Sequence, residues 1–328
     1  MNGKMLAAVA LYLATAAPSF AAAEPVTLRL GFIAASMHLF QSLPLYIAQQ
    51  KGVLAHENIK LEIVSLPGVG HMIEALDDGR VDLTSTALPY LIKGVLAESD
   101  AAAVVGGPAN IPSTFVARPE IKTFADLRRQ TIGLSLPVDI LSIGARRLLA
   151  KNGLTNSDYS VKELVGTPAR AKCLESAECA AVPLAQPDDI VLTRNGYRAL
   201  GTSYDVIPTL QFTVFAARRS WANQHKDDLV RFARAMGEAY QFMAKAENRD
   251  EVVALATTAT GAAPDVVSEI YDLYYRPYRG ALPMHGEINV PGVAKTIELL
   301  GGSGALKSPL PSADQFLDLE FLQAAGMQ

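Results

Sequence analysis

The chain has 328 residues, of which 29 are basic and 33 acidic, and half of its residues are hydrophobic. A chain of this length is expected to form about two domains and can bury a sizeable core without cross-links. The formal net charge of −4 excludes the strongly basic character that is typical of nucleic-acid-binding domains.

The N-terminus has the pattern of a secretory signal peptide. Lys4 precedes an apolar run over residues 5–17, and three alanines follow before Glu24. This pattern predicts cleavage after Ala23 and a periplasmic mature chain of residues 24–328. The alternative is a membrane anchor, but the run is shorter than the roughly 20 apolar residues of a spanning helix.

Cys173 and Cys179 are six positions apart. In an oxidising compartment such a pair favours a disulfide, here between the end of one helix and the start of the next strand. Two buried free thiols are the alternative, because the sequence does not give the geometry that a disulfide requires.

The residues after the signal peptide alternate between strand and helix patterns. The predicted strands cover 27–32, 60–66, 81–83 and 102–105, and the predicted helices cover 41–51, 72–78 and 89–96. Strands that alternate with helices at this spacing predict a mainly parallel sheet with helices on its faces.

The pattern restarts after Pro112. An extended segment at 114–117 leads to a capping box at Thr123 and Asp126. The following strands are predicted at 131–134, 160–165 and 180–184, and the helices at 140–152, from Thr167, and at 187–195. A second extended segment, 212–217, then precedes a nearly all-helical remainder.

We therefore predict an α/β fold with two lobes. Residues 24–112 and 213–328 form lobe 1, and residues 113–212 form lobe 2, which is inserted into lobe 1. The two extended segments, 114–117 and 212–217, mark where the chain crosses between the lobes. These two neighbouring chain crossings would act as a hinge. Ligands of such sheets bind beyond the carboxyl ends of the strands, which places the site between the lobes.

Five segments carry a family resemblance. They read LRLGFIAA at 28–35, PLYIAQQKGVL at 44–54, ALDDGRVDL at 75–83, RPEIKTFADLRRQTIGL at 118–134 and ARRLLAKNGL at 145–154. In this order and spacing they resemble the nitrate/sulfonate/taurine-type periplasmic binding proteins of ABC importers. The resemblance implies the type 2 periplasmic-binding-protein fold, with a ligand cleft between the lobes.

The resemblance also implies a function. The protein would capture a small-molecule solute and deliver it to an ABC permease in the inner membrane. It would act as a monomer, would not be an enzyme and would need no cofactor or metal. Two alternatives stay open: a same-fold enzyme of pyrimidine- or menaquinone-precursor metabolism, and a sensory receptor that presents its ligand.

The resemblance places the ligand site at four loops. Their candidate residues are Ser36, Met37 and His38; Gly68 and Gly70; Ser85 and Thr86; and Ser135, Leu136, Pro137, Val138 and Asp139. Phe40, Tyr90 and Tyr204 are candidates for stacking on an aromatic ligand. Ordinary connecting loops with Ser and Thr as helix caps are the alternative interpretation.

The chemistry of these loops favours an organic acid. Each loop precedes a helix, and helix starts offer free N–H groups to anions. The loops contain no Arg or Lys, which argues against a bare inorganic anion and for a carboxylate or sulfonate, with an aromatic body as one option. If Asp139 faces the cleft, it would repel an anion and could accept from hydroxyl or amine groups, so a neutral or amine-bearing ligand is the rival. Otherwise Asp139 favourably charges a helix start. Arg170, the nearest cation, is expected on a solvated helix face.

Overall fold

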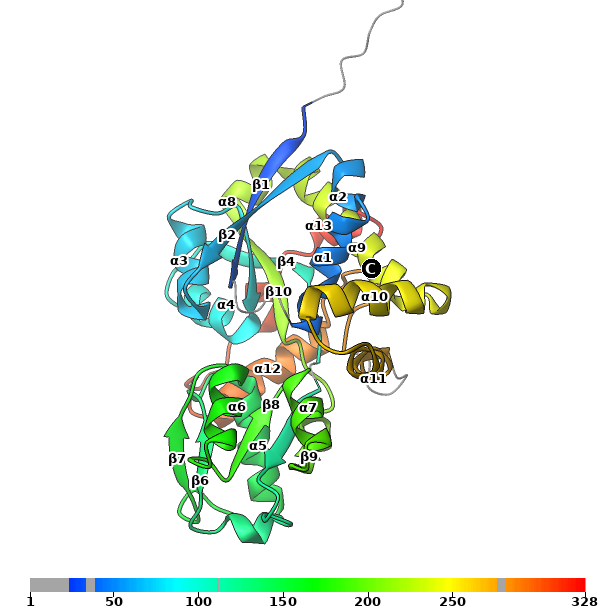
Figure 1. The fold of residues 1–328 in the computed structure, drawn as a ribbon. Helices are drawn as coiled ribbons and strands as arrows, with labels where there is room; N and C mark the ends of the chain where they lie inside the picture. The colour runs from blue at the N-terminus through cyan, green and yellow to red at the C-terminus, as the bar shows by residue number, and fades with distance from the viewer. Residues whose placement is uncertain (1–23, 34–38, 111, 276–280, 328) are drawn as a thin grey trace, which may run out of the picture.

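The computed structural model describes residues 24–33, 39–110, 112–275 and 281–327. The predicted signal peptide lies outside these ranges. The described chain forms two five-stranded sheets, one above the other in Figure 1, and each sheet has helices on its faces. The predicted fold class is therefore confirmed.

The first sheet has the strand order β2-β1-β3-β10-β4. Its strands are β1 (Val26–Ile33), β2 (Ile59–Leu66), β3 (Leu83–Ala87), β4 (Ala101–Gly106) and β10 (Thr213–Arg218). Strand β1 pairs parallel with β2 and β3, whereas β10 pairs antiparallel with β3 and β4. The strand that arrives last in the sequence thus fills a central position in the sheet.

The second sheet repeats this arrangement with the order β7-β6-β8-β5-β9. Its strands are β5 (Thr114–Ala117), β6 (Thr131–Leu134), β7 (Ser160–Glu163), β8 (Ala181–Leu184) and β9 (Arg198–Thr202). Strand β5 pairs antiparallel with β8 and β9, and β6 pairs parallel with β7 and β8. In each sheet, the strand that first follows a chain crossing is the antiparallel one.

Two strands differ from their predictions. Strand β3 begins at Leu83 and continues through Ala87, so Ser85 and Thr86 belong to a strand and not to the predicted loop. The cause is long-range pairing, because β10 aligns with residues 84–87. Strand β9 was not predicted, since RALGT lies at a sheet edge, is partly exposed and lacks alternation.

Helices cover both sheets, and most of those around the first sheet come from the C-terminal segment. The helices around the first sheet are α1 (Leu43–Gln50), α2 (Val53–His56), α3 (Met72–Asp77), α4 (Leu88–Val95), α8 (Arg219–Gln224), α9 (Lys226–Ala244), α10 (Arg249–Thr260), α11 (Pro264–Tyr275), α12 (Val290–Gly302) and α13 (Glu320–Ala324). Those around the second sheet are α5 (Ile140–Lys151), α6 (Thr167–Glu175) and α7 (Asp188–Arg194). Within the described ranges, no helix has the length and apolar character that a bilayer crossing requires.

The two chain crossings lie side by side. The Gly107 amide donates to Thr213 O at 3.1 Å, and the Thr213 amide donates to Pro108 O at 3.1 Å. Gln211 is fully buried, and its Nε2 donates to Thr213 O at 2.7 Å. Adjacent, hydrogen-bonded crossings are a suitable geometry for a hinge between two lobes.

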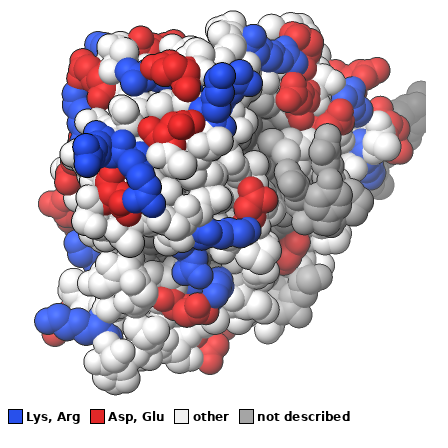
Figure 2. Space-filling view, turned by 90° about the horizontal axis from the view of Figure 1, so that it is seen from below, with Lys and Arg blue, Asp and Glu red and all other residues white. Residues whose placement is uncertain are grey.

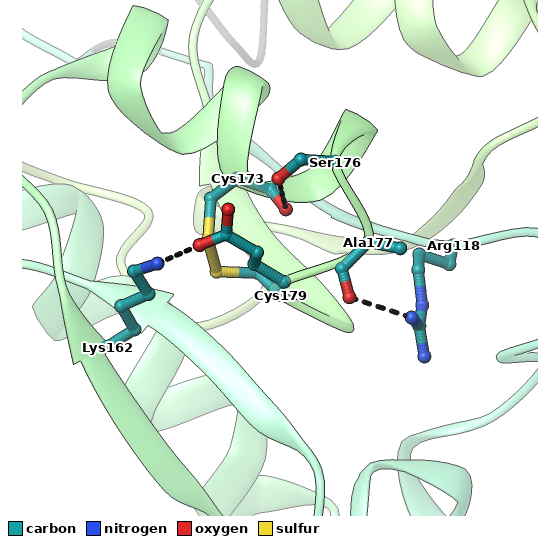
Figure 3. Close-up of a disulfide and its surroundings, with 7 residues drawn as sticks. Arg118, Lys162, Cys173, Ser176, Ala177 and Cys179 are labelled. Carbon is teal, nitrogen blue, oxygen red and sulfur yellow. Dashed lines mark hydrogen bonds and ion pairs between the residues drawn. A yellow bond between two sulfur atoms is a disulfide. The ribbon is translucent and has the colours of Figure 1, made fainter.

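The predicted disulfide between Cys173 and Cys179 is present, with Cα atoms 5.3 Å apart. Figure 3 shows it joining the last turn of α6 to the segment just before β8. The intervening turn is held further by Arg118, whose Nη1 donates to Ala177 O at 3.1 Å. The cross-link therefore fixes the C-terminal end of α6 against the second sheet.

The predicted capping box is also present, because the Thr123 amide donates to Asp126 Oδ2 at 2.9 Å.

Charged residues of both signs are interspersed on the face shown in Figure 2. That face carries no extended patch of a single sign.

Candidate functional site

A cavity of about 510 Å³ lies between the two sheets and is lined by residues of both. Thr86 and Tyr90 contribute from the side of the first sheet, and Ser135 and Thr167 from the side of the second. The volume falls within the range of about 300–1,000 Å³ that is common for small-molecule sites. It exceeds what a bare inorganic anion would fill.

Most of the cavity wall is apolar. The first-sheet side includes Leu45, Phe215 and Met236, and the second-sheet side includes Val138 and Ile140. An apolar ligand body that is removed from water here would contribute about 25 cal/mol for each Å² buried. The wall therefore suits a ligand whose larger part is apolar.

Two helices on opposite sides of the cavity begin at its wall. Helix α4 starts after Ala87 and helix α6 after Gly166, and each has a proline in its first two positions. Proline favours a helix start, and neither Ala nor Gly has a side chain that can cap the first amides. The two helix starts therefore direct a partial positive charge towards this region.

Asp139 and the buried Arg170 form a partly buried ion pair in the wall. Asp139 is the N-cap of α5, and its Oδ2 accepts from the Ser142 amide at 3.0 Å and from Arg170 Nη2 at 2.5 Å. Ser142 Oγ donates to the same oxygen at 2.6 Å and accepts from the Ser135 amide at 2.7 Å. This network fixes the wall segment 135–142 against α6.

The prediction that Arg170 lies on a solvated face is wrong. Its side chain is only 1% exposed, because its face of α6 packs inwards and Asp139 compensates its charge. The structure confirms that Asp139 lies at a helix start and also places it in the cavity wall. Its effect on a bound ligand stays a prediction.

The Arg170 side chain retains hydrogen-bonding capacity. Its Nε is buried and has no partner among the described residues. An orphaned donor of this kind costs about 1–3 kcal/mol relative to a satisfied one, and more when the group is charged.

Tyr90 approaches this ion pair from the opposite side of the cavity. Burial raises the pKa of Tyr90, the negative charge of Asp139 raises it further, and the positive charge of Arg170 lowers it. The Tyr90 hydroxyl is therefore neutral at ordinary pH and lies within electrostatic reach of both charges.

The predicted site residues divide into three groups. Those that line the cavity are Gly68, Ser85, Thr86, Tyr90, Ser135, Val138 and Asp139. Those outside its lining are Phe40, Gly70, Leu136, Pro137 and Tyr204. Ser36, Met37 and His38 lie outside the described residues. A ligand-binding role for the first group stays a prediction.

Residues outside the lining have other contacts or face solvent. Phe40 is fully buried, and its ring packs on Tyr274 with centroids 4.9 Å apart. The Tyr204 hydroxyl donates to Asn110 O at 3.1 Å, near the chain crossings. Gly70, Leu136 and Pro137 are exposed.

Helix α6 contributes a wall segment that was not among the predicted site residues. Residues 166–170 all line the cavity. The proline-started helix was visible in the sequence, but the direction of its first turn depends on how α6 packs. Within the described ranges, no group of three or more His, Cys, Asp or Glu side chains is placed to hold a metal ion.

Solved structures of periplasmic binding proteins resemble this chain. The ligand-binding component of an ABC-type import system from Staphylococcus aureus, with zinc bound, matches with a TM-score of 0.75 and 18% identity over 92% of this chain and 99% of that one. The nitrate-binding protein NrtA from Synechocystis PCC 6803 matches with a TM-score of 0.73 and 17% identity over 92% and 89%.

The alkanesulfonate-binding protein SsuA from Xanthomonas axonopodis, bound to MOPS, matches with a TM-score of 0.69 and 21% identity over 90% of this chain and 99% of that one. The desulfurization enzyme DSZB shares the fold as well, with a TM-score of 0.66 and 16% identity over 91% and 98%. At these identities the likeness establishes the two-lobed fold and leaves the ligand open.

None of the curated proteins matches the sequence. The sequence model described as NMT1/THI5 like matches residues 39–249, which is more than half of the chain. The structural neighbours confirm the predicted two-lobed periplasmic-binding-protein fold. The chain belongs to the NMT1/THI5-like family.

Proposed function

We propose that this protein is the solute-binding component of an ABC importer. It would capture a small organic acid in the periplasm and deliver it to a permease in the inner membrane, acting as a monomer after removal of residues 1–23. The cavity between the two sheets supports this assignment, together with the fold shared with import-system binding proteins.

The lobes would divide where the chain crosses, with residues 24–112 and 213–328 in lobe 1 and residues 113–212 in lobe 2. The hydrogen bonds between Gly107, Pro108 and Thr213 support a hinge at this position. Rotation about it would open and close the cavity around a solute.

The ligand class rests on one observation above all: Arg170 lies in the wall of a mostly apolar cavity with its Nε unpaired. A carboxylate or sulfonate would accept from this guanidinium and from the start of α6, which favours anions. The apolar wall would hold the rest of the ligand. This combination disfavours nitrate, which has no apolar body to bury.

Titration calorimetry and thermal unfolding on the mature chain would test the proposal. The panel would contain aromatic and aliphatic carboxylates, alkanesulfonates, nitrate and simple amines. We expect one site per chain for at least one organic acid, and about 2.7 kcal/mol of added stability at 100 times its Kd. Binding of nitrate or amines alone would contradict the ligand class.

The variant Arg170→Lys would test the role of the guanidinium. Lysine can still compensate Asp139 but lacks the planar edge that binds an anion at two points, so we expect at least a tenfold weaker affinity for the acid. Arg128→Lys is the matched control, because Arg128 pairs with Asp158 on the exposed surface outside the cavity lining. Equal affinities for both variants and the wild type would contradict this role.

An enzyme is the second candidate, because the desulfurization enzyme DSZB shares the fold. The titratable residues in the described wall are Tyr90, Asp139, Arg170 and Tyr240, and burial raises the pKa of Tyr240 well above its ordinary value. Mass spectrometry of the bound compound over hours would separate the two functions. Recovery of the unchanged ligand supports a receptor, and a new product supports an enzyme.

A further inference from the structure

The polar end of the cavity offers an acceptor as well as a donor. Asp139 Oδ2 accepts from Ser142 N, Ser142 Oγ and Arg170 Nη2. Asp139 Oδ1 accepts no hydrogen bond from the described residues, and the Asp139 side chain is 22% exposed. One carboxylate oxygen is therefore committed to the protein, and the other is left for a ligand.

Arg170 shows the complementary arrangement. One terminal nitrogen, Nη2, is committed to Asp139, while the buried Nε has no partner in the described parts of the chain. An arginine presents its donors in a fixed plane, so its uncommitted nitrogens lie beside the committed one. The anion-binding donors of Arg170 and the spare acceptor of Asp139 are therefore neighbours.

A plain carboxylate would use only half of this arrangement. Its charge would be attracted by Arg170 and by the α6 start but repelled by Asp139, since like charges at close range disfavour each other. A hydrogen-bond donor next to the ligand anion would convert that repulsion into a charge-assisted hydrogen bond to Asp139 Oδ1.

We propose that the ligand is a hydroxy- or amino-substituted organic acid with an apolar body. Its anionic oxygens pair with Arg170, its neighbouring hydroxyl or amine donates to Asp139, and its apolar part rests on the cavity wall. Tyr90 lines the same cavity from the side of the first sheet. The inference rests on the proposed solute-binding function and narrows its ligand.

Calorimetry with matched probes tests the inference. The probes are 3-phenylpropanoate, its 2-hydroxy and 2-amino derivatives and its 2-methoxy derivative, together with benzoate and its 2-hydroxy, 2-amino and 2-methoxy derivatives. We expect a donor-bearing acid to bind at least tenfold more tightly than its parent. The methoxy acid, which has an oxygen but no donor, should lose that advantage. This comparison requires no variant.

The variant Asp139→Asn supplies a second test. Its amide oxygen can cap α5, which turns the NH₂ group towards the cavity and removes the acceptor. We expect the parent acids to bind more tightly and the preference for the donor-bearing acid to fall below about threefold. Asp158→Asn, a substitution outside the cavity lining, should keep the wild-type preference.

The outcomes separate the proposal of a donor-bearing ligand from the proposal of an organic-acid receptor. If parent, methoxy and donor-bearing acids bind equally, the donor proposal is overturned and the organic-acid receptor stands. If none of these acids binds but nitrate or a simple amine does, the organic-acid assignment fails together with the donor proposal. A preference for the donor-bearing acids that survives in Asp139→Asn would overturn the assignment to Asp139.

Discussion

Asp189 is a buried carboxylate on the side of the molecule where α7 meets α11. It is 2% exposed, and it accepts from Thr114 Oγ1 and Gln186 Nε2, each at 2.7 Å. Burial raises the pKa of Asp189 to about 6, although these hydrogen bonds oppose the rise, and the neighbouring Asp188 adds to it. The charged form therefore persists at neutral pH at a cost to stability.

This raised pKa predicts a definite pH dependence. The folded state holds the proton more tightly than the unfolded chain, whose value is near 3.8. The contribution of Asp189 to stability is therefore fully present below pH 4 and is lost as the pH rises through 6. The loss is about 3 kcal/mol, because each pKa unit corresponds to about 1.4 kcal/mol.

We expect Asp189→Asn to gain stability relative to the wild type between pH 4 and pH 7, as measured by urea unfolding at several pH values. The control is Asp126→Asn, since hydrogen bonds from Thr123 and Lys122 lower the pKa of Asp126. That variant should lose stability relative to the wild type as the pH rises towards about 4, and the difference should then stay constant between pH 4 and pH 7. A pH-independent difference for Asp189→Asn would contradict the prediction.

Helix α12 anchors the second chain crossing. Asn289 precedes the helix, and its amide donates to the Gln211 side chain at 2.8 Å, while Thr296 Oγ1 donates to Gln211 O at 3.1 Å. Gly292 lies between these residues, where a Cβ atom would be 2.5 Å from Leu210 O. The absence of a side chain at Gly292 lets the helix touch the backbone of the crossing.

We expect Gly292→Ala to destabilise the protein by about 1–3 kcal/mol, because a methyl group at this contact would force the backbone apart. Gly302→Ala is the matched control at the other end of α12, where a Cβ would meet nothing within 4 Å. It should be neutral or stabilising by up to about 1 kcal/mol. Similar unfolding midpoints in urea for both variants would show that the close contact does not matter.

The disulfide stabilises the element that carries Arg170. Its short loop predicts a contribution of about 2 kcal/mol from chain entropy. The double variant Cys173→Ser/Cys179→Ser should lose about that much stability and should expose the end of α6 to faster amide exchange. A wild-type exchange pattern for α6 in this variant would contradict the anchoring role. Thiol counting under denaturing conditions without reductant checks that exported protein has no free thiol.

At the scale of the whole molecule, a second contact joins the lobes away from the crossings. Arg194 in α7 pairs with Asp265 and with Glu269 of α11, the latter at 2.8 Å. The Tyr274 hydroxyl of α11 donates to Gln186 Oε1 at 3.3 Å just before α7. Figure 1 shows α7 and α11 on the same side of the molecule, across the boundary between the sheets.

We expect Arg194→Ala to loosen this contact and to favour a more open arrangement of the lobes. Small-angle scattering of the ligand-free protein should report a larger radius of gyration, and amide exchange in α7 and α11 should become faster. High salt should weaken the same exposed contact in the wild type. Arg128→Ala, which removes the ion pair with Asp158 beside the second sheet, should leave both readouts unchanged.

The local sequence pattern was sufficient to predict much of the secondary structure of this protein. Alternation identified β1 and β2 nearly to their ends, and the proline at position 168 marked the start of α6. The cysteine spacing and the secretory pattern together predicted the disulfide that the structure contains. These features depend on residues that are close in the sequence, so the local sequence is enough to predict a single strand or helix start.

Contacts between distant segments could not be predicted from the sequence. Strand β3 extends to Ala87 only because β10, far along the chain, pairs with it. Arg170 is buried because α6 turns it towards Asp139, 31 positions earlier, and nothing in the local sequence separates that face from a solvated one. The sequence by itself therefore determined most of the elements and their order, but not β9 or the extent of β3. The tertiary structure decided which side chains meet there, because burial and ion pairing depend on how separate helices pack.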